Sequence, residues 1–168
     1  GLEMFYFQDG TFTFKPLKLL EELAPLYRKE VGLPFIALVR PETITERVAQ
    51  LLSIMNCVHV SIGFESGVET YRKEVLHRNM SNKQIIDATR FLTRVGIHVS
   101  AYNMIGLPGM DRKHVFETIR LNKLAKPNSS IVSIFIPFPD NELTKTLINK
   151  GMIKQTNIKS HMGTVPNV

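Results

Sequence analysis

Polar and charged residues stand at the ends of successive apolar segments of this sequence, where side chains able to bind a ligand could be grouped. An ionised carboxylate accepts hydrogen bonds, and a guanidinium can donate two of them at once to a carboxylate or phosphate. The residues of interest are, in chain order, Asp9, Arg40, Glu65 with Ser66, and Asn103. A fifth apolar segment closes at Pro137, Phe138 and Pro139. These residue types suit a shared ligand site.

Apolar periodicity identifies the elements that would position these residues. Short apolar runs bounded by turn residues predict strands at 5–7, 35–39, 58–63, 97–105 and 131–136. Apolar residues at helical spacing predict helices at 17–32, 45–55, 68–76, 83–95, 111–124 and 142–149. We expect Thr45 to cap the second helix and Gly96 to close the fourth. Residues 152–168 have no clear period and are expected to form a tail.

The order of these elements predicts the α/β class. Strands and helices alternate at spacings of roughly 25 to 35 residues, which is typical of parallel βα units. The carboxyl ends of parallel strands lie on one rim, where ligands bind, so the polar strand ends are expected to share one site. Taken singly, each could instead be a local cap or turn residue. Periodicity alone also does not distinguish an open doubly wound sheet from a barrel.

Composition narrows the function classes. The chain has 168 residues, 43% of them hydrophobic, which is enough for one core. It lacks an apolar run of the ~20 residues that a membrane-spanning helix needs, and we expect a cytoplasmic protein. A single cysteine, Cys57, excludes a disulfide framework and any metal site with several cysteines of this chain. The net charge of +6 is scattered, so a nucleic-acid partner is not expected, and the five histidines lack zinc-ligand spacing.

Four segments in register resemble the radical S-adenosylmethionine (radical SAM) superfamily over about residues 4 to 150. Residues 62–67, IGFESG, are similar to the IGxESG segment after the fourth strand of the family's barrel. Residues 103–109, NMIGLPG, resemble NxIxGLPGE after the fifth strand, and residues 137–143, PFPDNEL, resemble PFPGTxL after the sixth. Residues 7–13, FQDGTFT, are similar to FxDDxFT of a subgroup that often carries a cobalamin-binding domain. The resemblance implies an incomplete parallel (β/α) barrel over residues 1–150, with strand one missing and a tail at 151–168.

The resemblance also implies roles for residues of the S-adenosylmethionine site. Glu65, followed by Ser66, matches the acidic residue that approaches the ribose hydroxyls, although it could instead cap the following helix. Arg78 is similar to the basic residue that meets the methionine carboxylate, with a solvated helix-end position as the alternative. Asn103 is expected at the ribose or the substrate. The apolar stretch on which adenine packs corresponds to Ile105, Gly106 and Leu107.

Other residues are expected on the substrate side, and here the sequence departs from the subgroup. Asp9, Arg40 and Phe138 are placed there or just behind the substrate contacts. Gly10 replaces the second Asp of FxDDxFT, and Met110 stands where GLPG is usually followed by an acidic residue. These changes affect individual contacts and leave the pattern recognisable.

The largest departure is the absence of CxxxCxxC, which holds the family's [4Fe-4S] cluster. Cys57 does not match it and is expected to be a small buried residue. We therefore interpret the chain as a piece of a longer enzyme that reductively cleaves S-adenosylmethionine for radical hydrogen abstraction or methyl transfer of an unknown small-molecule substrate. The cluster would be bound outside this chain, cobalamin is a further possible cofactor, and the isolated chain is expected to be inactive.

Two alternatives stay open at this point. One is a self-contained α/β module that binds a nucleotide-like ligand, a protein or RNA without radical chemistry. The other is a phosphate-binding barrel isomerase or aldolase, which lacks a candidate Schiff-base lysine or carboxylate pair. If the strand at 5–7 lies at an open edge, we also expect the chain to self-associate through it.

Overall fold

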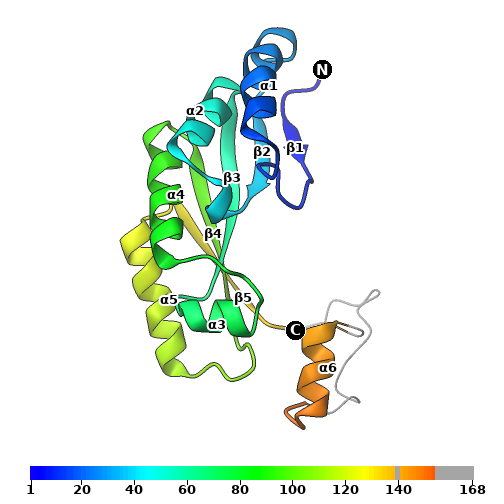
Figure 1. Cartoon of the computed structure of the whole chain (residues 1–168), viewed down its shortest axis with the longest axis vertical. Coiled ribbons are helices and arrows are strands. Elements are labelled where there is room, and N and C mark those ends of the chain that lie inside the picture. Colours follow the sequence, from blue (N-terminus) through cyan, green and yellow to red (C-terminus); the bar gives the residue numbers. More distant parts are fainter. Residues whose placement is uncertain (139–140, 154–168) are drawn as a thin grey trace.

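The computed structural model describes residues 1–138 and 141–153, and these contain one five-stranded sheet with helices on one of its faces (Figure 1). The strands are β1 (Phe5–Phe7), β2 (Phe35–Val39), β3 (Cys57–Glu65), β4 (His98–Ile105) and β5 (Ser129–Ile134). They pair in the order β1-β2-β3-β4-β5, and every neighbouring pair is parallel. The predicted α/β class with parallel βα units is confirmed, as an open sheet that does not close on itself.

Helices connect the strands at nearly the predicted places. They are α1 (Leu17–Glu30), α2 (Glu46–Ile54), α3 (Glu69–Glu74), α4 (Asn82–Arg94), α5 (Arg112–Ala125) and α6 (Glu142–Asn149), with a short 3₁₀ turn at Pro41–Thr43. Thr45 caps α2 as predicted, since its hydroxyl accepts a hydrogen bond of 3.2 Å from the backbone nitrogen of Val48. Gly96 follows α4 with φ +82°, a conformation that L side chains rarely adopt.

The core lies between the sheet and the helices α1, α2, α4 and α5. Alternate residues of a strand point to opposite faces, and the helix-facing series Val60, Ile62 and Phe64 of β3 is fully buried. The same face of β4 carries Val99 and Ala101, which are also fully buried. The predicted burial of Cys57, the first residue of β3, is confirmed, and burial raises the pKa of its thiol to about 12.

The opposite, open face of the sheet carries polar and aromatic side chains. His59 and His98 are register partners whose rings meet edge to face with centroids 4.8 Å apart. The Nε2 atom of His59 lies 2.8 Å from the Ser100 hydroxyl, which lies 2.6 Å from the hydroxyl of Ser129. This row of contacts gives both histidines partners within the sheet. Both histidines lie near the amino ends of β3 and β4, far from the carboxyl end of β3 that leads to α3 (Figure 1).

β5 and β3 differ most in extent from the prediction, whereas β4 differs by one residue. The structure begins β5 at Ser129 and ends it at Ile134, whereas the apolar pattern predicted residues 131–136. The early start has a physical reason: Ser129 and Ser130 continue the register with Ser100 and Ala101, and their hydroxyls find partners on neighbouring elements. β3 is longer than predicted because pairing extends to Glu65 through an irregularity between Gly63 and Glu65.

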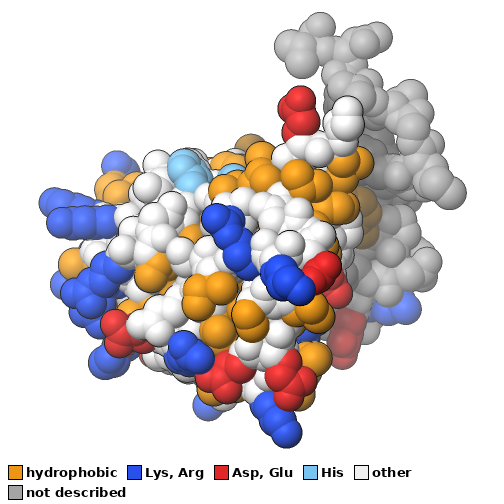
Figure 2. Space-filling view, turned by 90° about the horizontal axis from the view of Figure 1, so that it is seen from above, with side chains coloured by type: hydrophobic (Ala, Val, Ile, Leu, Met, Phe, Trp, Pro, Cys, Tyr) orange, Lys and Arg blue, Asp and Glu red, His pale blue; other side chains and the backbone are white. Residues whose placement is uncertain are grey.

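The molecular surface carries mixed charges. On the face seen from above in Figure 2, basic side chains are spread around the outline with acidic and apolar ones among them. No helix in the described ranges is both long and apolar enough to span a bilayer. The predicted tail at 151–168 lies mostly outside the described residues.

Candidate functional site

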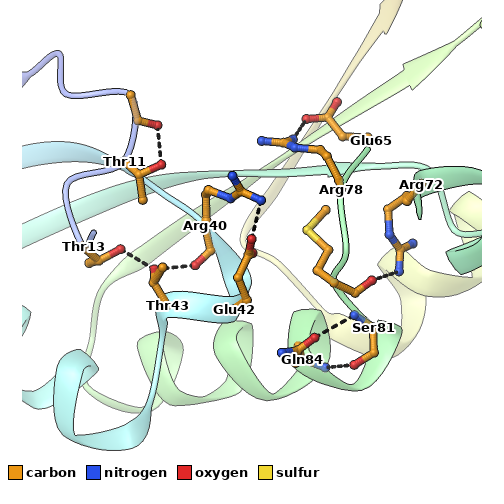
Figure 3. A network of polar contacts seen from close by, with 12 residues as sticks. Thr11, Thr13, Arg40, Glu42, Thr43, Glu65, Arg72, Arg78, Ser81 and Gln84 are labelled. Atoms are coloured by element: carbon orange, nitrogen blue, oxygen red, sulfur yellow. Dashed lines mark hydrogen bonds and ion pairs between the residues drawn. The ribbon is translucent and has the colours of Figure 1, made fainter. Parts of the chain in front are cut away.

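The carboxyl ends of β2, β3 and β4 surround a cavity of about 330 Å³ on the open face of the sheet. Two ion pairs lie at this cavity (Figure 3). Arg40 pairs with Glu42 after the end of β2, and Glu65 of β3 pairs with Arg78 in the segment before α4. The charged residues in the lining are Arg40, Glu65 and Arg78, and the polar ones include Ser61, Tyr102 and Ser133. Of the polar strand-end residues that the sequence suggested, Arg40, Glu65 and Asn103 contribute to this lining. That they bind one ligand stays a prediction.

Glu65 and Arg78 form the central ion pair, between Glu65 Oε1 and Arg78 Nη1. Their side chains are 17% and 29% exposed, so the pair is partly withdrawn from water but reachable from the cavity. Glu65 adopts φ +61°, a left-handed conformation that is unfavourable for a residue with a Cβ. Such a conformation costs free energy and is maintained only where surrounding contacts enforce it.

Gly63 gives this ion pair its place on the sheet. A Cβ atom at Gly63 would overlap Glu65 Oε1 and would lie 2.6 Å from Arg78 Nη1. The two charged groups therefore lie directly on the backbone of β3, in the space that a side chain at position 63 would fill. Only glycine leaves that space free.

Burial governs the electrostatics of the Glu65 carboxyl. Desolvation raises the pKa of Glu65 above its ordinary value, and the charge and hydrogen bond of Arg78 offset this only in part. The carboxylate is thus held in an environment that favours a further hydrogen-bond donor. A neutral hydroxyl can supply one without adding charge.

Arg40 forms the second ion pair with Glu42, at 2.5 Å between Nη2 and Oε1. The Nε atom of Arg40 and the second carboxylate oxygen of Glu42 are buried without a hydrogen-bond partner among the described residues. Arg40 lines the same cavity as Arg78. It therefore lies where the sequence predicted a residue on the substrate side, and its role there stays a prediction.

Asn103 lies at the rim, but its side chain turns away from the open face. Its Nδ2 donates to Ser130 Oγ at 2.9 Å, and its Oδ1 accepts from Asn122 Nδ2 of α5 at 2.8 Å. The side chain is therefore consumed in a hydrogen-bond network between the sheet and α5. Asn103 shares the helix-facing side of β4 with Val99 and Ala101, although it also contributes to the lining of the rim cavity. Its expected contact with the ribose or the substrate stays a prediction.

Ser66, unlike Glu65, does not line the cavity. The residue is fully buried, and its hydroxyl accepts a hydrogen bond of 3.2 Å from the backbone nitrogen of Val68. Its carbonyl oxygen accepts from the guanidinium of Arg72. Ser66 thus forms part of the turn beside Glu65. Its part in cofactor binding stays a prediction.

The remaining predicted residues surround the rim at greater exposure or on other surfaces. Asp9 is exposed after β1, with Lys15 Nζ 3.9 Å away. Ile105 ends β4 and lines a groove against α5, while Leu107 is buried. Gly106, between them, has φ +72°, a backbone conformation that favours glycine. Phe138 is 55% exposed beyond β5.

Sequence reasoning missed two residues that shape the site, Gly63 and Arg72. Gly63 lies within a strand pattern, where an isolated glycine can signal close approach of another group. Arg72 is fully buried at the centre of the segment between Glu65 and Arg78. Nothing in the local pattern of α3 marks it as buried, because arginine is almost always at the surface.

The residues described here do not offer ligands for an iron–sulfur cluster. No group of three or more His, Cys, Asp or Glu side chains capable of holding a metal ion occurs in the described ranges. The single cysteine of the sequence is buried, and its raised pKa disfavours the thiolate that a metal ligand requires. By contrast, Glu65 and Arg78 offer an acceptor and a donor at one cavity and fit an organic ligand with hydroxyl and carboxylate groups.

Fold and site together define an α/β protein with a charged cavity at the carboxyl ends of parallel strands. Residues 1–121 match the radical SAM superfamily, which is more than half of the chain. The chain therefore belongs to the radical SAM superfamily, and the resemblance noted in the sequence is confirmed.

Known proteins similar to this chain include methyltransferases. An uncharacterised methyltransferase of Pyrococcus horikoshii is 24% identical over 96% of this chain and 35% of its own length. Cytidylyl-2-hydroxyethylphosphonate methyltransferase of Streptomyces wedmorensis is 27% identical over 66% of this chain and 21% of its own. The solved structure of the radical S-adenosylmethionine methyltransferase TsrM from Kitasatospora setae, with cobalamin and a [4Fe-4S] cluster bound, matches with a TM-score of 0.78. That match has 16% identity and covers 89% of this chain and 29% of TsrM.

These comparisons support the fold and the family. At 16% identity the likeness to TsrM shows the fold alone. The chain spans about a third of the length of the Pyrococcus relative and less of the other two. The activity of a whole enzyme is therefore a matter for proposal.

Proposed function

We propose that this chain provides the S-adenosylmethionine-binding rim and the substrate-side wall of a radical SAM methyltransferase. The observation that carries the proposal is the Glu65–Arg78 pair, which lies on Gly63 at the carboxyl end of β3 and lines the rim cavity. Family membership supplies the cofactor, and the names of the two curated relatives favour methyl transfer.

Glu65 and Arg78 would each bind a different part of S-adenosylmethionine. The Glu65 carboxylate would accept hydrogen bonds from the ribose hydroxyls, which suits an anionic group in a partly desolvated site. Arg78 would release part of its contact with Glu65 and donate to the methionine carboxylate, for which a planar guanidinium is well shaped. Ile105, Gly106 and Leu107 would lie along the adenine, with the backbone of Gly106 allowing close approach.

Arg40 would act on the substrate side of the same cavity. Its guanidinium lines the cavity beside the cofactor residues and is already paired with Glu42. Asp9 and Phe138 would contribute more exposed contacts from neighbouring strand ends. The substrate is a small molecule, and TsrM with tryptophan bound shows that the shared fold accommodates one in that protein.

The cluster and the cobalamin would be held by parts of the enzyme other than this sequence, which has one cysteine. When bound, the cluster supplies the electron for cleavage of S-adenosylmethionine, and cobalamin can carry a methyl group. The proposal therefore includes inactivity of the isolated chain. After anaerobic incubation with iron and sulfide, it should show no cluster absorbance and no cleavage of S-adenosylmethionine. Robust turnover would refute this part.

Calorimetric titration with S-adenosylmethionine and S-adenosylhomocysteine tests the binding site. We expect Glu65→Gln and Arg78→Gln each to weaken binding by about tenfold or more, since a hydrogen bond to a charged group contributes roughly 1.5–3 kcal/mol. Glu22→Gln and Arg90→Gln change exposed side chains of α1 and α4 and serve as matched controls. Equal affinity of all four variants and the wild type would contradict the proposed site.

A second part of the proposal concerns the β1 edge of the sheet. Tyr6 is 51% exposed and β1 has a single partner, β2, among the described residues. Such an edge can pair with another strand, and we propose that isolated chains self-associate there. Light scattering over a concentration series should show dimers that Tyr6→Lys reduces. A monomer at every concentration would count against this proposal.

A further inference from the structure

Arg72 is a buried cation whose hydrogen bonds go to neutral groups. It lies in α3 with no exposed surface, and its guanidinium donates to the backbone oxygen of Ser66. It also donates to the backbone oxygen of Met80 at 2.9 Å and to the side-chain oxygen of Asn82 at 2.8 Å. Its Nε atom has no hydrogen-bond partner among the described residues.

Stability alone is a poor explanation for such a residue. Burial of a charged group carries a large desolvation cost, and well-packed apolar residues of similar volume are often equally or more stabilising. Burial accordingly lowers the pKa of Arg72, although the nearby charge of Glu69 opposes the shift. A planar guanidinium has one advantage that an apolar side chain lacks, which is that it can hold several acceptors at fixed angles.

The acceptors of Arg72 bracket the two site residues. Ser66 directly follows Glu65, and Met80 comes two residues after Arg78. The backbone oxygen of Arg72 in turn accepts a hydrogen bond of 2.9 Å from the backbone nitrogen of Arg78. One buried side chain and its own carbonyl therefore fix both ends of the segment that carries the ion pair. Figure 3 shows the contact of Arg72 at the Met80 end, beside the Glu65–Arg78 pair.

The same segment is fastened to α5. The backbone nitrogen of Gly67 donates to Thr118 Oγ1 at 2.8 Å, and Asn82 Nδ2 donates to the Gly67 oxygen at 3.0 Å. A Cβ atom at Gly67 would overlap the carbonyl oxygen of Glu117, so the turn lies directly on the helix backbone. Arg72 is thus connected to α5 through Asn82 and Gly67.

We infer that Arg72 is a positioning residue: it holds the segment from Ser66 to Asn82 so that Arg78 stays on Glu65 above Gly63. Ligand affinity then depends on Arg72 although its side chain is outside the cavity lining. The identity of that ligand rests on the proposed function, but the positioning of Arg78 does not.

A titration of the Glu65 carboxyl tests the inference without any ligand. Carbon-13 NMR of glutamate-labelled protein follows the carboxyl, and Glu65→Gln assigns its resonance. In the wild-type background, Arg78→Gln should raise the pKa of Glu65, because the cation lowers it. In an Arg72→Lys background, which keeps a charge but cannot span three acceptors, the same substitution should shift the pKa by less than half as much.

Controls separate positioning from loss of folding. Arg90→Lys changes an exposed arginine of α4 and should leave the full shift, and circular dichroism confirms that each variant is folded. If Arg72→Lys does not fold, Asn82→Ala removes one acceptor and replaces it in the comparison. Equal shifts in both backgrounds would overturn the inference.

Ligand binding provides a second readout. S-adenosylmethionine should bind the folded Arg72→Lys variant at least tenfold more weakly than the wild type. Wild-type affinity in that variant would also overturn the inference. If the wild type itself does not bind S-adenosylmethionine, the proposed function fails, and the carboxyl titration still decides the role of Arg72.

Discussion

Glu65 and Asn103 are register partners at the ends of β3 and β4, yet they do opposite things. Glu65 faces the open side of the sheet, pairs with Arg78 and lines the cavity. Asn103 faces the helices and uses its amide to join Ser130 and Asn122. The same kind of position, a polar residue at a strand end, thus carries an ion pair beside the cavity in one strand and joins the sheet to α5 in the next.

The alternation of side chains along the strands explains this difference. Glu65 continues the open-face series of His59, Ser61 and Gly63, whereas Asn103 continues the buried series of Val99 and Ala101. The pairing is irregular between Gly63 and Glu65, and as a result Glu65 lies opposite Asn103 although the two side chains are on different faces of the sheet. A polar residue at a strand end is therefore a candidate for the site only if its position in the alternation is that of the open face.

Substitution of Asn103 by leucine gives the largest expected effect on stability. The change removes the hydrogen bonds of the Asn103 amide to Ser130 and Asn122, which keep their mutual hydrogen bond of 3.1 Å. We expect the free energy of unfolding to fall by about 1–3 kcal/mol. Urea denaturation measures this, with the exposed Gln50→Ala as a control. Affinity for S-adenosylmethionine should change by less than about twofold. A large loss of affinity with unchanged stability would restore Asn103 to the ligand site.

Gly63→Ala should have the opposite profile. The new Cβ displaces Glu65 Oε1 and Arg78 Nη1, which are ends of flexible side chains, so the sheet can persist. We expect a change in unfolding free energy below about 1 kcal/mol and a loss of affinity of about tenfold, equivalent to roughly 1.4 kcal/mol. Gly10→Ala is the matched control, because its Cβ would meet nothing within 4 Å in the same cavity lining. Equal affinities of the two alanine variants would contradict the idea that ligand binding requires the Glu65–Arg78 pair to lie on Gly63.

The fold was more predictable than the site, for physical reasons that these residues illustrate. Apolar periodicity reports what the core requires, so it located five strands and six helices, including the Thr45 cap. It shifted β5 because Ser129 and Ser130 satisfy their hydroxyls in the sheet and lack an apolar signal. The helix-facing orientation of Asn103 was predictable in principle, since the alternation of Val99 and Ala101 can be read from the sequence.

Other parts of the site could not be predicted from local patterns. Arg72 contributes through contacts with Ser66, Met80 and Asn82, which only the folded segment brings together. The left-handed Glu65 is likewise a product of tertiary contacts, because its own residue type disfavours that conformation. Contacts between segments that only the tertiary fold brings together leave no periodic signal in the sequence.

The pH dependence of stability provides the smallest expected effect and the most direct measure of the Glu65 environment. Because burial raises the pKa of Glu65 above its ordinary value of 4.5, the folded state binds the proton more tightly than the unfolded state. This contribution to stability is complete below 4.5 and is lost as pH rises through the raised pKa of the folded state. Glu65→Gln removes it, so the unfolding free energy of the variant should rise relative to the wild type across that window and then level off.

Urea midpoints of wild type and Glu65→Gln between pH 4 and 8 measure the difference, and Glu22→Gln should follow the wild type throughout.

Arg78→Gln sharpens the comparison with Asn103. Without the cation the pKa of Glu65 rises further, so the loss of stability should extend to higher pH and become larger. Asn103→Leu should lower stability equally at every pH, because its network contains no titrating group. Parallel profiles for Glu65→Gln and the wild type would show that the Glu65 carboxyl is solvated rather than withdrawn into the rim.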